Sequence, residues 1–463
     1  MSQQQLGRSP VRPDPPPPPP DASRPGRFVG WLGGFGCAAA AYAVFQSLVG
    51  VLPETLSADA ARYGIAAVSG VGTGVAAWLA AALLRARPEQ GAAGPGPVAA
   101  PARAALAPAP GPFPALAAAA HTALRADLAV VDDPVRGLLT GWAHALDEQT
   151  RPVLPTPTGT AYGLHVLLEL GVQDGRLSTS DLVDTLWRLR LPDGGWAARS
   201  QGSVPRPEVT ALVLGALARA GADPARLADE AARCAARFTA DLEPSGLART
   251  HVVTTVLRGL LRAAPDAPAI ARLRDSLVDH TITDPAREHR RCWGATLGLP
   301  AAHATRPSPV HTALAVVALD RAARVLGEDA NTRAAREDGI RWLLACPTPD
   351  HDTCADLVNA QEEVRRPHPE VAWRQEVLFV RHFTAAWMVR ALLTPGAWEV
   401  AAAEGREEAW RALVASAVTA VLRAERDGVW HWDGHDLGRP LWMTYQGLSA
   451  LRAHAVWMYQ PEG

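Results

Sequence analysis

The sequence has few cysteines, few aromatic residues and no excess of charge of either sign. Its five cysteines are scattered and odd in number, which argues against a disulfide framework and favours a reducing compartment. The 45 Lys and Arg residues are balanced by 47 Asp and Glu residues, which argues against a nucleic-acid partner. Aromatic residues make up only 6% of the chain, whereas 48% of its 463 residues are hydrophobic. This composition suits a chain longer than one typical domain with a large core.

Two proline-rich segments divide the N-terminal part of the chain. Residues 1–27 contain an unbroken proline run at positions 15–20 and almost no large apolar side chain, so we expect a disordered tail. Residues 86–112 are mostly Ala, Pro and Gly, which is typical of a semi-stiff linker. The remaining residues, 113–463, are expected to form the C-terminal domain.

Two uncharged stretches lie between the tail and the linker. Residues 28–52 and 63–84 are each long enough to cross a bilayer, so residues 28–85 predict a transmembrane helical hairpin that anchors the protein in the membrane. Arginines outside both ends place the C-terminal domain in the cytoplasm. Ala and Gly dominate both stretches, so a buried soluble hairpin is the alternative. The apolar region is too long for a cleaved signal peptide.

A turn followed by an apolar helix recurs along residues 113–463. In the best copy, Pro192-Asp193-Gly194-Gly195 ends one helix, because proline lacks an N–H group and paired glycines favour positive φ. The apolar run at 210–217 then predicts a helix buried on every face. A threonine marks the start of each such helix, at Thr160, Thr210, Thr254, Thr312, Thr384 and Thr444.

A more amphipathic segment precedes each marker threonine. These segments are Leu138–Leu146, Leu182–Leu189, Ala231–Phe238, Ile270–Val278, Ala334–Leu344 and Ala409–Leu422. Helix pairs of this kind cannot bury their apolar faces alone, so they are expected to close on one another. The sequence therefore predicts an all-α fold, an (α/α)6 toroid of six inner and six outer helices.

The Asp193-Gly194-Gly195-Trp196 turn, with the helix from Pro205 through Thr210 that follows it, resembles the repeat of the squalene and terpene cyclase and protein prenyltransferase families. Asp427-Gly428-Val429-Trp430 followed by Thr444 resembles a second copy. The resemblance covers about the last three-quarters of the chain. It implies an isoprenoid ligand inside the barrel.

In such a ring the N-termini of the inner helices converge on a shared cavity. Their dipoles and cationic side chains would suit a diphosphate or a carboxylate. The candidate ligand-binding residues are Arg206, His251, His311, Glu376, Arg381, Arg439, Trp442 and Tyr445, with Glu208 and His382 as the catalytic candidates. For Glu208 a helix-dipole role and for His311 a packing or capping role are the alternatives.

The acid motif DxDD of the class II terpene cyclases is absent from the sequence. With so few aromatic residues to stabilise carbocations, this disfavours classical cyclisation. Prenyltransferase β-subunits hold zinc with an Asp-x-Cys pair and a later His, and Asp352, Cys354 and His382 are the matching zinc candidates. Here, however, the pair lies in a long connection well before an inner helix. No cofactor is otherwise expected.

Two functions are therefore considered. One is a membrane-anchored terpene cyclase-like or prenyltransferase-like protein that binds an isoprenoid or a similar anionic-headed lipid. The other is a catalytically inactive toroid that acts as a membrane-tethered scaffold with a protein partner, in bacterial signalling or defence. An open cavity would favour the first, and a centre plugged by Trp293, Trp387 and Trp442 would favour the second. The polar connection at 350–374 is expected to be functional or a lid.

Overall fold

The structure is a computed structural model that describes residues 113–146, 153–171, 177–199, 202–245, 248–298, 305–345, 355–367, 373–432 and 438–459. The chain divides into two compact units, residues 1–97 and 98–463, and all described residues belong to the second. The predicted tail, transmembrane hairpin and linker lie outside the described residues. Among the helices that are described, none combines the length and apolar character needed to cross a bilayer.

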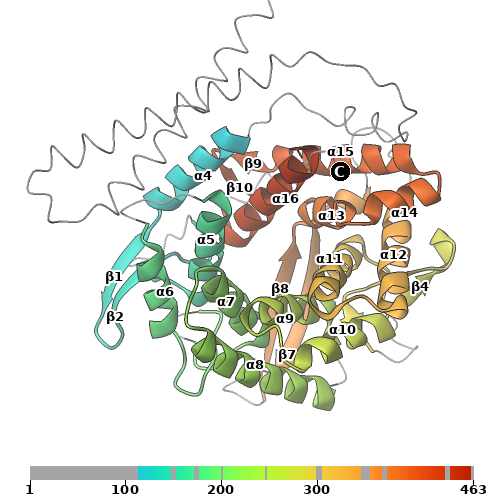
Figure 1. Ribbon diagram of the computed structural model, residues 1–463. Helices are drawn as coiled ribbons and strands as arrows, with labels where there is room; N and C mark the ends of the chain where they lie inside the picture. The colour runs from blue at the N-terminus through green and yellow to red at the C-terminus, as the bar shows by residue number, and fades with distance from the viewer. Residues whose placement is uncertain are drawn as a thin grey trace, which may run out of the picture. The chain divides into compact units, whose positions relative to one another are not determined.

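Six helices form a closed inner ring (Figure 1). Each contacts the next in chain order, and the last also contacts the first, so the ring has no open end. The inner helices are α5 (Pro157–Leu170), α7 (Pro207–Arg219), α9 (Thr250–Ala263), α11 (Pro309–Leu326), α13 (Thr384–Leu392) and α16 (Leu441–Tyr459). Closure allows each inner helix to bury apolar side chains against two neighbours and one outer helix.

Six further helices surround this ring, and the fold is an α/α toroid. The outer helices are α4 (Phe113–Ala126), α6 (Thr179–Arg188), α8 (Pro224–Ser245), α10 (Ala269–Asp279), α12 (Ala330–Leu344) and α15 (Glu407–Arg423). A short helix, α14 (Ala397–Ala403), lies between α13 and α15.

The prediction of the first outer helix at Leu138–Leu146 is wrong. Strand β2 (Gly137–Gly141) occupies the first part of that segment, the rest of it is not helical either, and β2 pairs antiparallel with β1 (Ala129–Asp133). A short apolar run bounded by glycines fits a strand as well as a helix, and here the hairpin is held to α6 by the bond from the Thr140 N–H to the Thr185 hydroxyl. The first outer helix is instead the alanine-rich α4, directly after the predicted linker.

The marker threonines bind the tryptophans of the preceding turns. In four repeats the backbone N–H of the tryptophan donates to the threonine hydroxyl. The distances are 3.4, 3.0, 3.1 and 3.3 Å for Trp142–Thr160, Trp196–Thr210, Trp293–Thr312 and Trp430–Thr444. Each of these buried indoles also donates from Nε1 to a carbonyl near the end of an outer helix, Leu124, Leu186, Leu277 or Val421. The repeated Trp and Thr therefore join the end of an outer helix to the start of its inner partner.

The third and fifth repeats begin differently. The Thr250 hydroxyl of α9 donates to the Gly294 carbonyl at 2.6 Å, and Thr254 lies one turn further along the same helix. Helix α13 starts at Thr384, directly after a strand. Neither Thr254 nor Thr384 forms a Trp–Thr pair with any described tryptophan.

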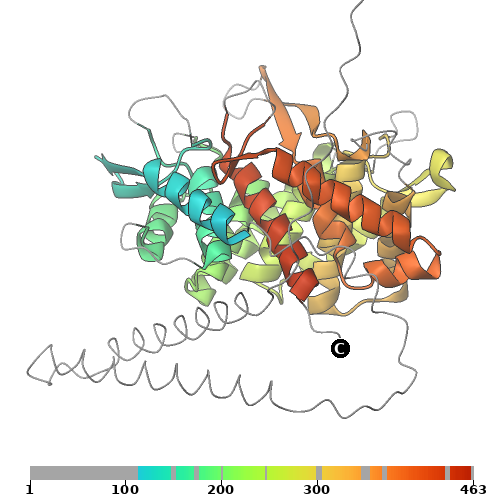
Figure 2. The same cartoon turned by 90° about the horizontal axis from the view of Figure 1, so that it is seen from above.

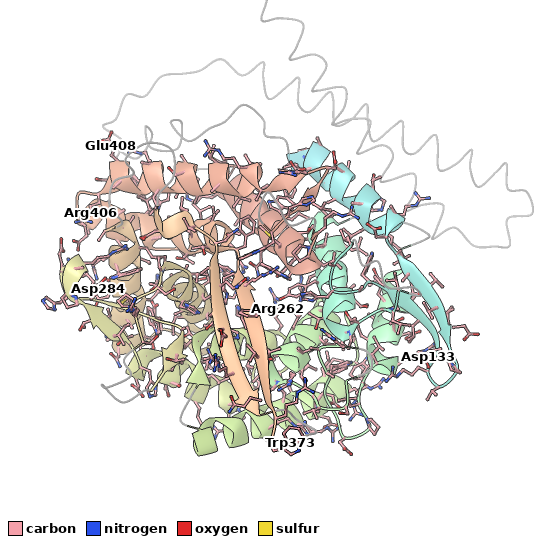
Figure 3. The ribbon with its side chains drawn as sticks, turned by 180° about the vertical axis from the view of Figure 1, so that it is seen from behind. Asp133, Arg262, Asp284, Trp373, Arg406 and Glu408 are labelled. Carbon is pink, nitrogen blue, oxygen red and sulfur yellow. The ribbon has the colours of Figure 1, made fainter. Side chains whose placement is uncertain are left out.

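The long connection between α12 and α13 forms the hairpin of β7 (Ala360–Pro367) and β8 (Gln375–His382), after a 3-10 turn at Ala355–Leu357. Figure 3 shows this hairpin lying across the ring, with Trp373 near its tip. From the side it projects from one end of the toroid (Figure 2). Shorter antiparallel strand pairs join β3 (Ala248–Arg249) with β6 (Thr296–Leu297), β4 (Ile282–Asp284) with β5 (Arg290–Cys292), and β9 (Glu425–Arg426) with β10 (Val429–Trp430).

Candidate functional site

A cavity of about 660 Å³ lies inside the ring, within the size range of small-molecule sites. All six inner helices contribute side chains or backbone to its wall, and residues 377–382 of β8 lie at its mouth. Lining residues include Tyr162, Leu212, Arg258, Leu314, Trp387 and Tyr445, one from each inner helix. The toroid thus encloses a compartment whose wall is partly apolar and partly charged.

Helix α9 contributes a polar stripe to this wall. His251, Thr255, Arg258 and Arg262 follow one another at intervals of four, three and four residues, which places them on one face of the helix. The other faces of α9 carry buried apolar residues that pack against the neighbouring helices. The stripe therefore runs from the mouth of the cavity to its floor.

Arginine side chains gather in the interior, and Arg262 lies within the ring (Figure 3). Arg258, Arg262 and Arg321 line the cavity, and Arg390 lies beside them. No carboxylate in the described part of the chain forms an ion pair with any of these four. Arg258 donates to the Thr254 carbonyl at 3.0 Å and to the Thr255 hydroxyl at 3.2 Å. Both terminal nitrogens of Arg390 are buried without a hydrogen-bond partner.

The neighbouring Arg219, in contrast, has a carboxylate partner. It pairs with Glu169 at 3.0 Å, and the same carboxylate also lies 3.4 Å from Arg452. Glu169 also acts electrostatically on Arg390, but it forms no ion pair with any of the four arginines above in the described part of the chain. A buried charge without an ion-pair partner is costly, and the described side chains leave the positive charge of these arginines unbalanced.

The pKa shifts in the interior have the direction expected for excess positive charge. Burial lowers the pKa of Arg321 and Arg390, and it lowers that of Arg258 to about 9. Burial would raise the pKa of Tyr445, but Arg262, Arg390 and Arg321 outweigh it and lower the value to about 8. Burial and then Arg262 lower the pKa of His165. Each of these shifts reduces the net positive charge.

Aromatic rings provide the apolar part of the wall. The guanidinium carbons of Arg258 and Arg390 lie 4.4 and 4.2 Å from the ring centroid of Trp387. Tyr445 stacks on His165 at 4.9 Å and lies 5.9 Å from Tyr162. Indole and guanidinium groups together form a part of the wall that is both apolar and positively charged.

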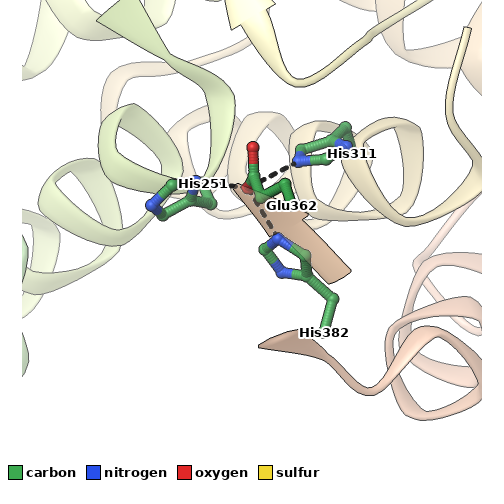
Figure 4. Close-up of side chains that lie close together, drawn as sticks. All are labelled: His251, His311, Glu362 and His382. Atoms are coloured by element: carbon green, nitrogen blue, oxygen red, sulfur yellow. Dashed lines mark hydrogen bonds and ion pairs between the residues drawn. The ribbon is translucent and has the colours of Figure 1, made fainter. Parts of the chain in front are cut away.

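A second cluster lies at the mouth of the cavity (Figure 4). His251 and His311 come from the first turns of α9 and α11, His382 ends β8, and Glu362 comes from β7. The three imidazoles approach one oxygen, Oε1 of Glu362, at 2.9, 3.4 and 2.8 Å from His251 Nδ1, His311 Nε2 and His382 Nε2. The other carboxylate oxygen accepts from Arg249 at 3.2 Å.

The histidines and the carboxylate of this cluster are electrostatically distinct. Burial lowers the pKa of His311, and it lowers that of His382 to about 4, so both are neutral at pH 7. Burial would raise the pKa of Glu362, but its interactions with His251, His311 and His382 outweigh it and hold the pKa well below its ordinary value. Neutral imidazoles and an ionised carboxylate are the ligand types that bind zinc and related metals.

The structure brings together six of the residues predicted from the sequence. His251, Arg381, His382, Trp442 and Tyr445 line the cavity, and His311 belongs to the cluster at its mouth. Trp387 also lines the cavity, but Trp293 packs in its Trp–Thr pair instead. The lining side chains leave an open space, and the catalytic role of His382 stays a prediction.

Four other predicted residues are not among those lining the cavity. Arg206 is the N-cap residue of α7, and Glu208 lies in the first turn of that helix. Burial raises the pKa of the Cys234 thiol in α8, and the nearby charge of Glu208 raises it further. Arg439 pairs with Asp127 at 3.2 Å, which ties the last repeat to the first. Glu376 lies in β8 opposite Arg366. The zinc candidates Asp352 and Cys354 lie outside the described residues.

The prediction from the sequence included neither the deeper residues Arg258, Arg262, Arg321 and Arg390 nor Glu362. It considered only the N-terminal ends of the inner helices, whereas the arginines lie one to three turns further along. The spacing of His251, Thr255, Arg258 and Arg262 on an otherwise apolar helix was a readable signal. Glu362 reaches the cluster through the β7–β8 hairpin, and no comparable pattern in the sequence indicates that pairing.

Comparisons with known proteins leave the family open. No family model matches the chain, and no curated protein does either. A solved structure, a glycoside hydrolase family 76 mannosidase from Bacteroides thetaiotaomicron, matches 75% of this chain and 98% of its own length at 8% identity and a TM-score of 0.43. A likeness at this level carries no argument about ligand or activity. The resemblance to cyclases and prenyltransferases stays a prediction.

Proposed function

We propose that the toroid binds an organic anion in its central cavity, and that an isoprenoid diphosphate or a similar anionic-headed lipid is the ligand class. The observation that carries this proposal is the set of cavity arginines, Arg258, Arg262 and Arg321, that have no carboxylate partner among the described residues. A bound diphosphate would neutralise this buried charge and accept hydrogen bonds from the guanidinium groups.

The apolar wall supports the second half of the proposal. Trp387, Tyr162 and Tyr445 offer ring faces beside the arginines, and Leu212 and Leu314 widen the apolar surface. A cavity of about 660 Å³ has room for a chain of several isoprene units together with its head group. The sequence contains no lysine, so every side-chain cation in the wall other than a protonated histidine is a guanidinium, which binds phosphate oxygens in pairs.

Equilibrium binding to the full-length protein tests this proposal. Calorimetric titration is expected to give binding of farnesyl diphosphate and at least a roughly 10-fold weaker affinity for farnesol, since charge-assisted hydrogen bonds contribute about 1.5–3 kcal/mol each. Replacing Arg321→Met should weaken diphosphate binding by at least roughly 10-fold.

The matched control for that variant is Arg324→Met. Arg324 lies one turn along the same helix, but it is 61% exposed and pairs with Asp320 at 2.7 Å. Its replacement should leave diphosphate affinity unchanged. Equal affinities for farnesol and farnesyl diphosphate, or equal losses in the two variants, would contradict recognition of an anion in the cavity.

A catalytically inactive toroid that serves as a scaffold for a protein partner, in bacterial signalling or defence, is the second candidate. The absence of a DxDD motif from the sequence favours it. The titration above separates the candidates, because a scaffold with no small-molecule ligand would bind neither farnesyl diphosphate nor farnesol.

We also propose that residues 28–85 anchor the protein in the membrane with the toroid in the cytoplasm. The support is the pair of uncharged stretches and the arginines that flank them. Reporter enzymes fused after Gly463 test the orientation. A reporter that works only in the cytoplasm should be active, and activity of a reporter that works only in the periplasm would refute the proposed orientation.

A further inference from the structure

The geometry points to a zinc site at the mouth of the cavity, formed by His251 Nδ1, His311 Nε2, His382 Nε2 and Glu362 Oε1. The four ligand atoms all lie within 4.8 Å of one another. Ligand atoms of a tetrahedral zinc with bonds of about 2.0–2.1 Å are about 3.3 Å apart. Side-chain shifts on the order of 1 Å would therefore bring the four atoms to zinc-binding distances.

Hydrogen bonding alone does not account for the arrangement. A carboxylate oxygen offers two lone pairs, yet three imidazole nitrogens approach the single atom Glu362 Oε1. His251 Nδ1 is the atom left over, because it is buried and lacks a hydrogen bond of acceptable geometry although it lies 2.9 Å from that oxygen. A cation placed between the four groups would use the free lone pair of each nitrogen.

Neighbouring groups hold two of the ligands in position. Ser308 Oγ lies 2.8 Å from His311 Nδ1, which leaves Nε2 of that ring facing the cluster. Arg249 engages Oε2 of Glu362, so that Oε1 faces the histidines. Partners of this kind orient the ligands of most metal sites. The nitrogen-rich ligand set with one carboxylate matches zinc better than magnesium or calcium, which prefer oxygen.

The ligands come from three separate parts of the chain, the starts of α9 and α11 and the β7–β8 hairpin. A bound zinc ion would therefore fasten the hairpin to the ring at the mouth of the cavity. This consequence does not depend on the organic anion, so the site can be tested without any such ligand.

Zinc binding by the full-length protein is the test. After removal of metal with a chelator and dialysis, titration with Zn²⁺ should give about one tightly bound ion per chain, with a dissociation constant below about 1 µM. X-ray absorption at the zinc edge should show nitrogen and oxygen neighbours at about 2.0–2.1 Å and no sulfur. Hydrogen exchange of β7 and β8 should slow when zinc is added.

Two variants and a control complete the test. The double variant His251→Gln/His382→Gln should lose at least roughly 100-fold in zinc affinity, and Ser308→Ala roughly 10-fold. The control is His280→Gln. His280 is exposed and lies outside the cluster, where its ring contacts the Ser276 carbonyl. The zinc affinity of this variant should equal that of the wild type.

Three results would overturn the proposal. These are the absence of stoichiometric binding by the wild-type protein, sulfur in the zinc coordination shell, or undiminished affinity in the double variant. The first two are measured on the wild-type protein, so they hold even if the double variant does not fold.

Discussion

Arg321 shows how the interior can be arranged for a ligand rather than for stability. This residue is half-buried and has no carboxylate ion-pair partner within the described residues, and desolvation lowers its pKa. Replacing such a group with an apolar side chain of similar length removes an uncompensated charge. The same substitution removes a contact for an anionic ligand.

We therefore predict that Arg321→Met raises the free energy of unfolding of the ligand-free protein by about 1–2 kcal/mol. Urea unfolding measures this change. Arg324→Met, on the exposed face of the same helix, should instead lower the free energy of unfolding, because it removes the ion-pair partner of the buried Asp320. A loss of stability in Arg321→Met would mean that Arg321 has a compensating partner in the ligand-free protein.

Tyr445 reports the charge of the cavity directly. Its pKa of about 8 lies below the value of about 10 in an unfolded chain. Ionisation of Tyr445 therefore adds stability as pH rises from 8 to 10, and this contribution is lost as pH falls through 8. Ultraviolet titration should detect one tyrosine that ionises near pH 8 and is missing in Tyr445→Phe.

Farnesyl diphosphate should shift that titration to higher pH, because a negative charge in the cavity opposes tyrosinate formation. Tyr162 is an internal reference, since burial raises its pKa to about 12. If Tyr445 titrates at its ordinary value both with and without the ligand, the arginines do not act on it as described.

At the scale of elements, the contact between α7 and α9 depends on two glycines that differ in the space around them. A Cβ atom at Gly259 would lie 2.2 Å from the Ala211 carbonyl oxygen, whereas one at Gly215 would lie 3.6 Å from its nearest neighbour. Gly259 therefore sets how closely the two helices approach, and Gly215 does not.

We predict that Gly259→Ala costs about 2–3 kcal/mol of stability, because α7 must move away to admit the new methyl group. Gly215→Ala should be neutral or stabilising by up to about 1 kcal/mol, since alanine is the better helix former. Thermal and urea unfolding of both variants checks the contrast. Equal costs at the two positions would contradict the described helix contact.

The local sequence of each helix and strand explains which of them could be predicted. The marker threonines located all six inner helices, and in four repeats the same threonine accepts the hydrogen bond that joins the preceding turn to the inner helix. Helix α4 was not predicted, because its alanine-rich sequence continues the composition of the predicted linker. The β7–β8 hairpin was not predicted either, because the residues of its two strands carry no periodic apolar pattern.

At the scale of the whole molecule, the structure is a ring and not an open stack of repeats. Helix α16 contacts α5 and α4 as well as α13 and α15, and Arg439 pairs with Asp127 across the junction. In an open solenoid the loss of the last repeat would affect only its single neighbour. In a ring it exposes the first repeat too.

Ending the chain after Arg439, which removes α16, is therefore predicted to speed hydrogen exchange in α4 and α5 by roughly 100-fold or more, the factor that a loss of about 3 kcal/mol of local stability produces. Exchange mass spectrometry measures this at the level of individual helices. Faster exchange confined to α13 and α15 would indicate an open stack instead.

The cavity follows from ring closure, and so does its charge, because the arginines of α9, α11 and α13 meet only when the helices face a common centre. The sequence predicted the shared cavity and the cationic residues at its mouth. It could not reveal which of the arginines further along each helix face inward, since that depends on how each helix is rotated in the ring.

A crystal structure of the full-length protein with farnesyl diphosphate tests the central claim most directly. The diphosphate is predicted to lie in the central cavity within hydrogen-bonding distance of Arg258, Arg262 and Arg321, with its chain against Trp387. Density for the ligand only on the outer surface, or in the cavity with the diphosphate directed away from these arginines, would contradict the account.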